Sequence, residues 1–253
     1  MIILNERKWA EDALAGKTFN GDMFGSMKLV SCLFADRGMT KSETRDAVVD
    51  YILACSPRSS IVKMDDSINA AVGYGHNHKL LEVDAINVYD EEIKTIRGIS
   101  HGKQAERLAF TLLCLSKYWN IKLDSDKSWV NTKTTEIMRL ANIRTSVKRQ
   151  GDMYNYLKED GLITLSKRVD CTNVRVDFSS EIGDIAISIT DFRNLGNQYL
   201  MYIGEPFFVC AECGAVTKMN NPGVGRKQKY CADCAMAVKA AQSIQSAKRI
   251  KLR

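Results

Sequence analysis

The sequence predicts a mainly α-helical protein with small β elements, that is, an α+β protein. Its 253 residues include only three prolines and are 45% hydrophobic, a composition typical of a compact, helix-rich chain. Apolar residues recur at helical spacing in most segments before Gly161. Two Cys-X-X-Cys pairs near the C-terminus add a motif typical of a metal-bound module.

These observations divide the chain into three predicted domains. A helical N-terminal domain is expected at residues 1–100, a winged helix-turn-helix domain with an extra strand and helix at 101–205, and a four-cysteine, treble-clef-like zinc finger with a basic helical tail at 206–253. No Ser-rich or Gly-rich tether precedes the finger, and the apolar residues 207–209 lie against its first cysteine pair. The finger is therefore expected to dock on the body.

The N-terminal domain is predicted to begin with a small bundle of three helices, followed by a fourth helix. Asn5 is the expected cap of the first helix, the second runs from about residue 22 to 37, Thr40 and Glu43 form a capping box for the third, and the fourth covers about 60–71. Residues 73–78 are then expected to be an exposed loop, because no cysteine or carboxylate motif completes a metal site around its two histidines.

The rest of this domain is predicted to mix strand and helix. Residues 80–88 favour two short strands around an Asp-Ala turn, and 90–97 favour a helix in which Glu91 and Glu92 are solvated. Residues 1–100 hold 12 basic and 15 acidic side chains, a net charge of −3. This acidity favours protein docking or dimerisation over DNA binding for the domain.

The next segment resembles a winged helix-turn-helix. An apolar helix at 101–120 precedes a short helix capped by Asn131 or Thr132, a tight turn at 142–143, and a second helix that is capped by Thr145 or Ser146 and stopped by Gly161. Residues 162–166 and 173–178 alternate as two strands, and 167–172 form the wing between them. A strand at 184–189 and a short helix from about 191 to 202 follow.

The second helix of this segment is the predicted recognition helix. Its expected inward face consists of Val147, Met153, Tyr154 and Leu157. The side chains predicted to reach base edges cluster around its first two turns: Arg144, Lys148, Arg149 and Gln150. The side chains predicted to contact the nucleic-acid backbone lie in the wing and the finger: Lys167, Arg168, Arg175, Arg226, Lys227 and Lys229. Gly151 indicates either a close helix contact or a shorter helix.

The four cysteines are predicted to bind one structural zinc ion. Cys210 and Cys213 form the first pair, and Cys231 and Cys234 follow after 17 intervening residues, so that two thiolate hooks complete a tetrahedral site with no open position. Gly214 is expected at positive φ, two short strands are expected to flank a turn at 220–223, and a helix is expected from 232 to about 248. The alternatives are two disulfides or four unrelated cysteines.

The charge distribution points to a polyanionic partner. The formal net charge is +6, but residues 214–253 alone hold nine basic side chains against one acidic, a net charge of +8. That basic tail favours nucleic acid as the partner, most simply double-stranded DNA. No cleavable signal and no membrane-spanning run are evident, so we expect a cytoplasmic protein without a membrane partner.

Four segments carry a resemblance to a known group of proteins: Arg107 to Asn120, Ile137 to Gln150, Thr190 to Gly196, and Lys229 to Cys234. They resemble uncharacterised winged-helix plus zinc-finger proteins of phages and integrative elements of low-GC Gram-positive bacteria. The resemblance covers most of the chain and implies a viral or mobile-element protein in a bacterial host cell. It implies no catalytic residue.

Two functional hypotheses follow from these patterns. The first is a phage or mobile-element DNA-binding protein, a regulator or a replication organiser, that uses the winged helix and the finger on one duplex. The second is a host-takeover or anti-defence inhibitor that binds a bacterial enzyme, such as a polymerase or a CRISPR-type nuclease, or its RNA. No nucleophile motif, phosphate loop or dinucleotide fingerprint occurs, so the sequence predicts a non-enzyme. It does not indicate the oligomeric state.

Overall fold

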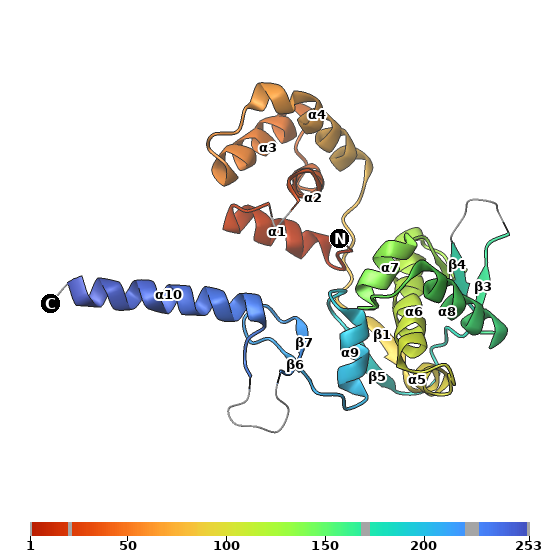
Figure 1. The fold of residues 1–253 in the computed structure, drawn as a ribbon. Helices are drawn as coiled ribbons and strands as arrows, with labels where there is room; N and C mark the ends of the chain where they lie inside the picture. The colour runs from red at the N-terminus through yellow and green to blue at the C-terminus, as the bar shows by residue number, and fades with distance from the viewer. Residues whose placement is uncertain (1, 20–21, 168–172, 221–227, 252–253) are drawn as a thin grey trace. The chain divides into compact units, whose positions relative to one another are not determined.

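The computed structural model describes residues 2–19, 22–167, 173–220 and 228–251, with side chains as far as residue 244 (Figure 1). The chain divides into two compact units, Met1–Asp84 and Ala85–Arg253. In the described ranges it is predominantly helical, with three small antiparallel sheets.

The first unit is a bundle of four helices. They are α1 (Glu6–Gly16), α2 (Met23–Asp36), α3 (Lys41–Cys55) and α4 (Ile61–Asn77). α2 contacts each of the other three and supplies much of the core, including Met27, Val30 and Leu33 (Figure 1). Two predicted caps are confirmed: Asn5 Oδ1 accepts the backbone N–H of Lys8 at 2.8 Å, and the capping box before α3 is complete.

α4 is longer than the sequence pattern predicts, and residues 73–77 belong to its last turns rather than to an exposed loop. The reason is a close helix crossing. A Cβ on Gly75 would lie 2.6 Å from the Cβ and carbonyl carbon of Ser31 in α2, so the glycine lets two backbones approach. His76 contacts α3 instead, with its Nε2 3.0 Å from Thr44 Oγ1.

The boundary between the units lies at 84/85, whereas the sequence pattern places it at 100/101. Only one strand forms in the predicted hairpin, β1 (Ile86–Tyr89), and its partner is the distant β5 (Ile185–Ile189). Glu82 instead makes an isolated bridge with Asn5. β1 and α5 (Asp90–Arg97) thus belong to the second unit, because the sheet partner of β1 lies about a hundred residues later and leaves no local signal.

A buried ion pair between Glu92 and Lys117 stabilises this first part of the second unit. Glu92 is 1% exposed, contrary to the predicted solvated position, and its Oε1 lies 2.9 Å from Lys117 Nζ. The same carboxylate accepts the N–H groups of Ser180 and Tyr89 at 2.8 and 2.9 Å, and Lys117 donates to Asn87 O at 2.8 Å. Since every bond is made, the pair is a satisfied polar network rather than an uncompensated buried charge.

We expect Glu92→Gln to lower the free energy of unfolding of the second unit by about 2 kcal/mol, because an amide leaves Lys117 without a counter-charge and cannot accept at its nitrogen. Urea unfolding measures this change. Glu91→Gln is the matched control, since Glu91 pairs with Lys94 at the surface and its loss should cost less than about 0.5 kcal/mol. Equal effects of the two substitutions would contradict the importance of the buried pair.

The middle of the second unit has the element order helix, strand, helix, helix, strand, strand. The elements are α6 (Lys103–Leu123), β2 (Trp129–Val130), α7 (Thr134–Leu140), α8 (Val147–Glu159), β3 (Ile163–Leu165) and β4 (Val174–Val176). The strands form a sheet in the order β2-β4-β3, to which β2 adds a strand that the sequence pattern does not predict. Helix α6 supplies much of the core, and its side chains Leu108, Leu112 and Leu115 are fully buried.

The helix boundaries in this region follow some of the predicted signals. Ser146 caps α8 as predicted, accepting the N–H of Arg149, and Gly161 takes positive φ (71°) just after the helix. The predicted cap of α7 is wrong: Lys133 occupies the position without a side-chain bond, and Thr132 Oγ1 accepts Trp119 Nε1–H at 2.9 Å instead. Arg168, Cys171 and the rest of 168–172 lie outside the described residues.

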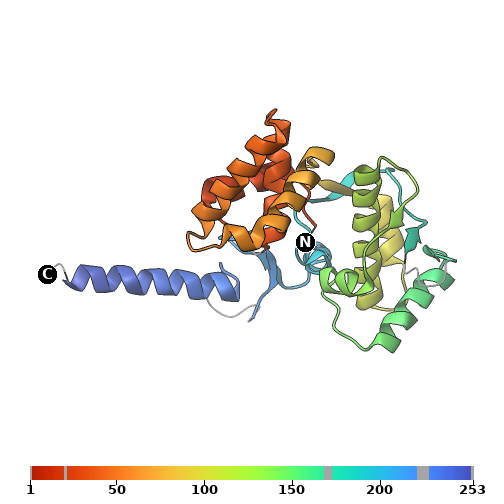
Figure 2. The same ribbon diagram turned by 90° about the horizontal axis from the view of Figure 1, so that it is seen from above.

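The last part of the second unit contains one internal helix, one hairpin and a terminal helix. These are α9 (Leu195–Tyr202), β6 (Phe207–Val209), β7 (Val216–Lys218) and α10 (Ala232–Lys251). β6 and β7 pair antiparallel, and both contact α9. α10 is one continuous helix in both views, and its described side chains are mostly exposed, including Met236 and Ile244 (Figure 2).

Candidate metal centre and nucleic-acid interface

The first cysteine pair forms the tight turn of the β6–β7 hairpin. Cys210 N donates to Ala215 O at 3.0 Å, and Gly214 N donates back to Cys210 O at 2.9 Å, which folds the chain around the two thiols. Gly214 has φ +72°, as predicted. The strands therefore flank the cysteine turn, not residues 220–223. This placement corrects the sequence prediction, although 221–227 lie outside the described residues.

The second pair lies at the start of α10. Ala235 N donates to Cys231 O at 2.9 Å, the first helical bond of that turn. Ala211 N in the first turn donates to Lys229 O at 2.9 Å, so a backbone bond holds the two cysteine segments side by side. Local folding of each segment and this backbone bond help to bring the thiols together.

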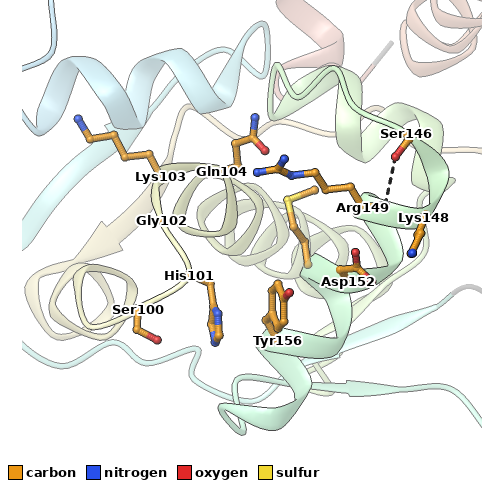
Figure 3. Close-up of a pocket in the computed structure, with 11 residues that line it drawn as sticks. Ser100, His101, Gly102, Lys103, Gln104, Ser146, Lys148, Arg149, Asp152 and Tyr156 are labelled. Carbon is orange, nitrogen blue, oxygen red and sulfur yellow. Dashed lines mark hydrogen bonds between the residues drawn. The ribbon is translucent and has the colours of Figure 1, made fainter.

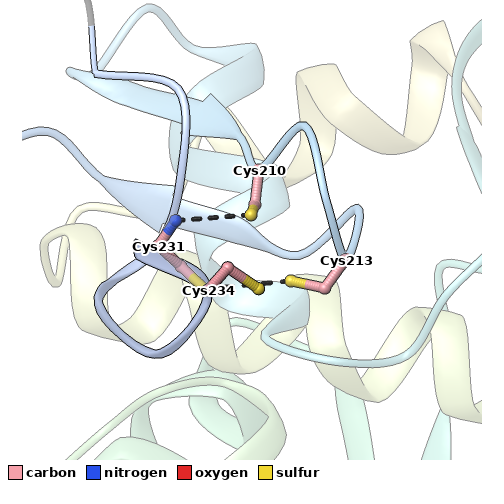
Figure 4. A group of neighbouring side chains, drawn as sticks. All are labelled: Cys210, Cys213, Cys231 and Cys234. Carbon is pink, nitrogen blue, oxygen red and sulfur yellow. Dashed lines mark hydrogen bonds between the residues drawn. The ribbon is translucent and has the colours of Figure 1, made fainter. Parts of the chain in front are cut away.

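The four sulfur atoms form one compact cluster (Figure 4). All lie within 4.8 Å of one another, and Cys213 Sγ is 3.9 Å from Cys231 Sγ. A tetrahedral ion with metal–sulfur bonds of about 2.3 Å requires sulfur–sulfur separations of roughly 3.8 Å. The cluster can therefore hold one metal ion with little movement of the side chains.

Hydrogen bonds shift the pKa values of two thiols in the cluster in opposite directions. The backbone N–H groups of Cys213 and Cys231 lower the pKa of Cys210 to about 6, and the distance from Cys231 N to Cys210 Sγ is 3.3 Å. The hydrogen bond with Cys231 and burial raise the pKa of Cys234. A metal ion would displace the thiol protons of the cluster, since its ligands are thiolates.

The finger is joined to α9 by apolar and polar contacts. Phe208 and Val216 are buried, as expected for a docked finger. Arg193 Nη2 donates to Cys213 O at 2.7 Å, and Asn197 Nδ2 donates to Val216 O at 3.1 Å. Neither polar contact was predicted from the sequence. The only sequence signal of the two residues is their position in the segment Thr190 to Gly196 and just after it, and that segment does not indicate a contact with the finger.

The three predicted cations of the recognition helix are exposed. Arg144 precedes α8, and Lys148 and Arg149 lie in its first turn. Within the described residues no carboxylate forms an ion pair with any of the three. Gln150 differs, since it is half-buried and its Nε2 donates to Thr145 O at 3.1 Å.

The inward face of α8 is shorter than predicted. Met153 and Leu157 are buried and Tyr154 is half-buried, but Val147 is 83% exposed, so its predicted inward position is wrong. Val147 is the first residue of the helix, and its side chain lies outside the core. Neither predicted explanation of Gly151 is observed, because a Cβ there would meet nothing within 4 Å and the helix continues to Glu159.

The remaining residues, which are predicted to contact the nucleic-acid backbone, differ in how free their charges are. Lys167 and Lys229 are exposed. Arg175 is exposed as well, but its Nε donates to Asp177 Oδ1 at 2.6 Å and its Nη2 to Thr164 Oγ1, so its charge is already paired. Arg168, Arg226 and Lys227 lie outside the described residues.

A cleft of about 770 Å³ lies between the first residues of α6 and one side of α8 (Figure 3). Lys148 and Arg149 line it, and Arg149 extends toward Gln104. The ring of His101 stacks on Tyr156 with centroids 4.1 Å apart, which the sequence did not indicate. The basic residues of α8 therefore border a concave surface, not a flat one.

Comparison with protein-family models, curated proteins and solved structures finds no match for this chain. Among the described residues, no helix combines the length and apolar character that crossing a membrane requires.

Proposed function

We propose that the protein is a non-enzymatic nucleic-acid-binding protein of a phage or mobile element, and that it binds double-stranded DNA in the cytoplasm of a bacterial host. The observation that carries the proposal is the cluster of three exposed cations just before and within the first turn of α8, which form no ion pair with any described carboxylate: Arg144, Lys148 and Arg149. Exposed cations at the beginning of an exposed helix suit the phosphates and base edges of a major groove.

The arrangement around α8 supports a winged helix. Helix α6 precedes a short strand, the pair α7 and α8 follows, and β3 and β4 form the antiparallel hairpin after the pair. In a winged helix the second helix of the pair enters the groove and the hairpin loop reaches the backbone. Lys167, two residues after β3, supports this role, together with Arg168 of the sequence prediction. Arg175 contributes less, because Asp177 already pairs with it.

The cysteine cluster supports one structural zinc ion in a treble-clef-like finger. The chain supplies a cysteine turn within a hairpin and a second cysteine pair at the start of a helix. Four thiolates leave no position for a substrate, so the ion would stabilise the fold rather than perform chemistry. The finger would then place Lys229, with Arg226 and Lys227 of the sequence prediction, near the nucleic-acid backbone.

We expect the double substitution Lys148→Glu and Arg149→Glu to weaken binding to a mixed-sequence DNA duplex by at least about tenfold and to flatten its salt dependence, because two cations become anions at the proposed interface. Fluorescence anisotropy at several salt concentrations measures both quantities. The matched control is Lys63→Glu with Lys79→Glu, the same charge change on exposed residues of the first unit. Unchanged affinity and salt slope, or equal losses in both variants, would reject this interface.

The alternative is an inhibitor that binds a bacterial polymerase, a CRISPR-type nuclease or its RNA. The first unit favours it: residues 1–84 hold 10 basic and 12 acidic side chains, a net charge of −2, and Val62 is largely exposed on α4. A pull-down from bacterial lysate, with and without nuclease, separates the two functions. A stoichiometric protein that remains after nuclease treatment supports the inhibitor, and competition by RNA against duplex DNA identifies an RNA ligand.

A further inference from the structure

The side-chain amide of Asn197 is buried between the finger and the turn that joins α7 to α8. Asn197 is 5% exposed. Its Nδ2 donates to Val216 O in β7 at 3.1 Å, and its Oδ1 accepts Asn142 Nδ2 at 2.9 Å. Asn142 is the turn residue itself, with φ +51°. One amide therefore connects the cysteine hairpin with the turn that precedes the recognition helix.

The orientation of this amide is fixed by chemistry. Val216 O can only accept a hydrogen bond, so the Nδ2 of Asn197 must face it. The Oδ1 then faces the turn, where Asn142 supplies a donor. Reversing the amide would leave the carbonyl oxygens of Asn197 and Val216 facing each other in a buried site. The bridge between β7 and the turn therefore has one favourable arrangement.

Two neighbouring contacts hold the start of α9 close to the two segments that Asn197 joins. A Cβ on Gly196 would lie 2.0 Å from Ala141 O, which places the first turn of α9 directly against the residue before Asn142. On the other side, Arg193 donates to Cys213 O while Asp191 holds its guanidinium. α9 therefore contacts both the cysteine hairpin and the α7–α8 turn.

The position of Val216, which Asn197 bonds in the finger, depends on the metal. In the described residues from 206 to 244, the buried apolar side chains are only Phe208, Cys210 and Val216. So small a core does not order a hairpin alone, and a bound ion must supply the remaining stabilisation. Val216 O keeps its position beside Asn197 only while the finger is folded.

We propose that Asn197 is a positioning residue that couples the metal centre to the α7–α8 turn, so that metal binding fixes how Arg144, Lys148 and Arg149 are presented. The coupling stands on the contacts above. Its consequence for DNA rests on the proposed function: zinc removal would weaken the contribution of α8 to duplex binding as well as that of the finger.

Zinc affinity tests the coupling without any nucleic acid. Coupled sites affect each other reciprocally, so breaking the bridge at the turn should weaken zinc binding by about tenfold, the value of one buried hydrogen bond. Asn142→Gly removes the amide and keeps the left-handed turn. Competition with a chelator dye measures the affinity. Asp124→Gly is the control, since it is also a change to glycine at a left-handed position (φ +46°), at the exposed C-terminal end of α6. Unchanged zinc affinity in Asn142→Gly would overturn the proposal.

Hydrogen exchange in the full-length protein gives the second test. The amides of Asn142 and Ile143 donate to Arg139 O and Met138 O in the folded turn. Chelation should speed their exchange by about tenfold, and Asn197→Leu should do the same with zinc still bound. If chelation leaves these amides as protected as before, the coupling is wrong. If they respond while no form of the protein binds duplex DNA, the coupling stands and the proposed function fails.

Discussion

Replacing Cys210 and Cys234 with serine is expected to abolish zinc binding and to unfold the finger while the first unit stays folded. The substitutions remove one thiolate from each pair, and two thiolates cannot hold a structural ion tightly. Without the ion, the described residues between 206 and 244 keep only three buried apolar side chains, too small a core to order this segment. The ion normally contributes about 10–16 kcal/mol to such folds.

Metal analysis and limited proteolysis measure this outcome. Wild-type protein should contain one equivalent of zinc and resist cleavage between residues 206 and 244, and the double variant should lose both properties. Cys55→Ser is the control, because Cys55 is a free thiol in α3 outside the cluster. A double variant that keeps one zinc equivalent would reject the four-cysteine site. Loss of α1 to α4 as well would show that the finger is not a separable module.

Gly196→Ala is expected to destabilise the second unit by more than about 3 kcal/mol, the upper range for overpacking a rigid site. The added methyl would lie 2.0 Å from Ala141 O and 2.6 Å from Ala141 C, and backbone atoms cannot rotate away as a side chain can. α9 cannot retreat easily either, because Leu195 and Tyr199 are fully buried and Tyr199 OH donates to Glu106 Oε2.

Chemical denaturation followed by circular dichroism measures the effect of this substitution. Gly151→Ala is a matched control, since it is the same change in a helix where the new Cβ meets no atom within 4 Å. It should stabilise the protein by up to about 1 kcal/mol, because alanine loses less backbone entropy than glycine. Similar stabilities of Gly196→Ala and wild type would mean that α9 does not pack against the turn as described.

Local signals in the sequence predicted most of the elements correctly. Capping residues are such signals: Asn5, Thr40 and Ser146 each accept the backbone bond that their position before an apolar helix predicts. The cysteine spacing likewise predicted the cluster, because each pair closes within one turn. These features depend on neighbours a few residues apart, which is why they are legible in the chain.

Long-range contacts account for the errors. The strand at Ile86–Tyr89 finds its partner at Ile185–Ile189, and Glu92 becomes buried because Lys117 and Ser180 surround it. Gly75 lies within α4 rather than in a loop, and its missing side chain lets α2 pass close by. None of these partners is adjacent in sequence, so composition and periodicity could not indicate them.

The sequence by itself determined the helix-rich class, the four thiols and the cations at the start of α8, since propensity, spacing and charge are properties of short segments. Only the tertiary structure decided that Gln150 and Arg175 are engaged within the protein, and that Asn197 joins the cysteine hairpin to the α7–α8 turn. The physical reason is that a hydrogen bond between distant segments exists only after packing has brought its donor and acceptor within about 3 Å of each other.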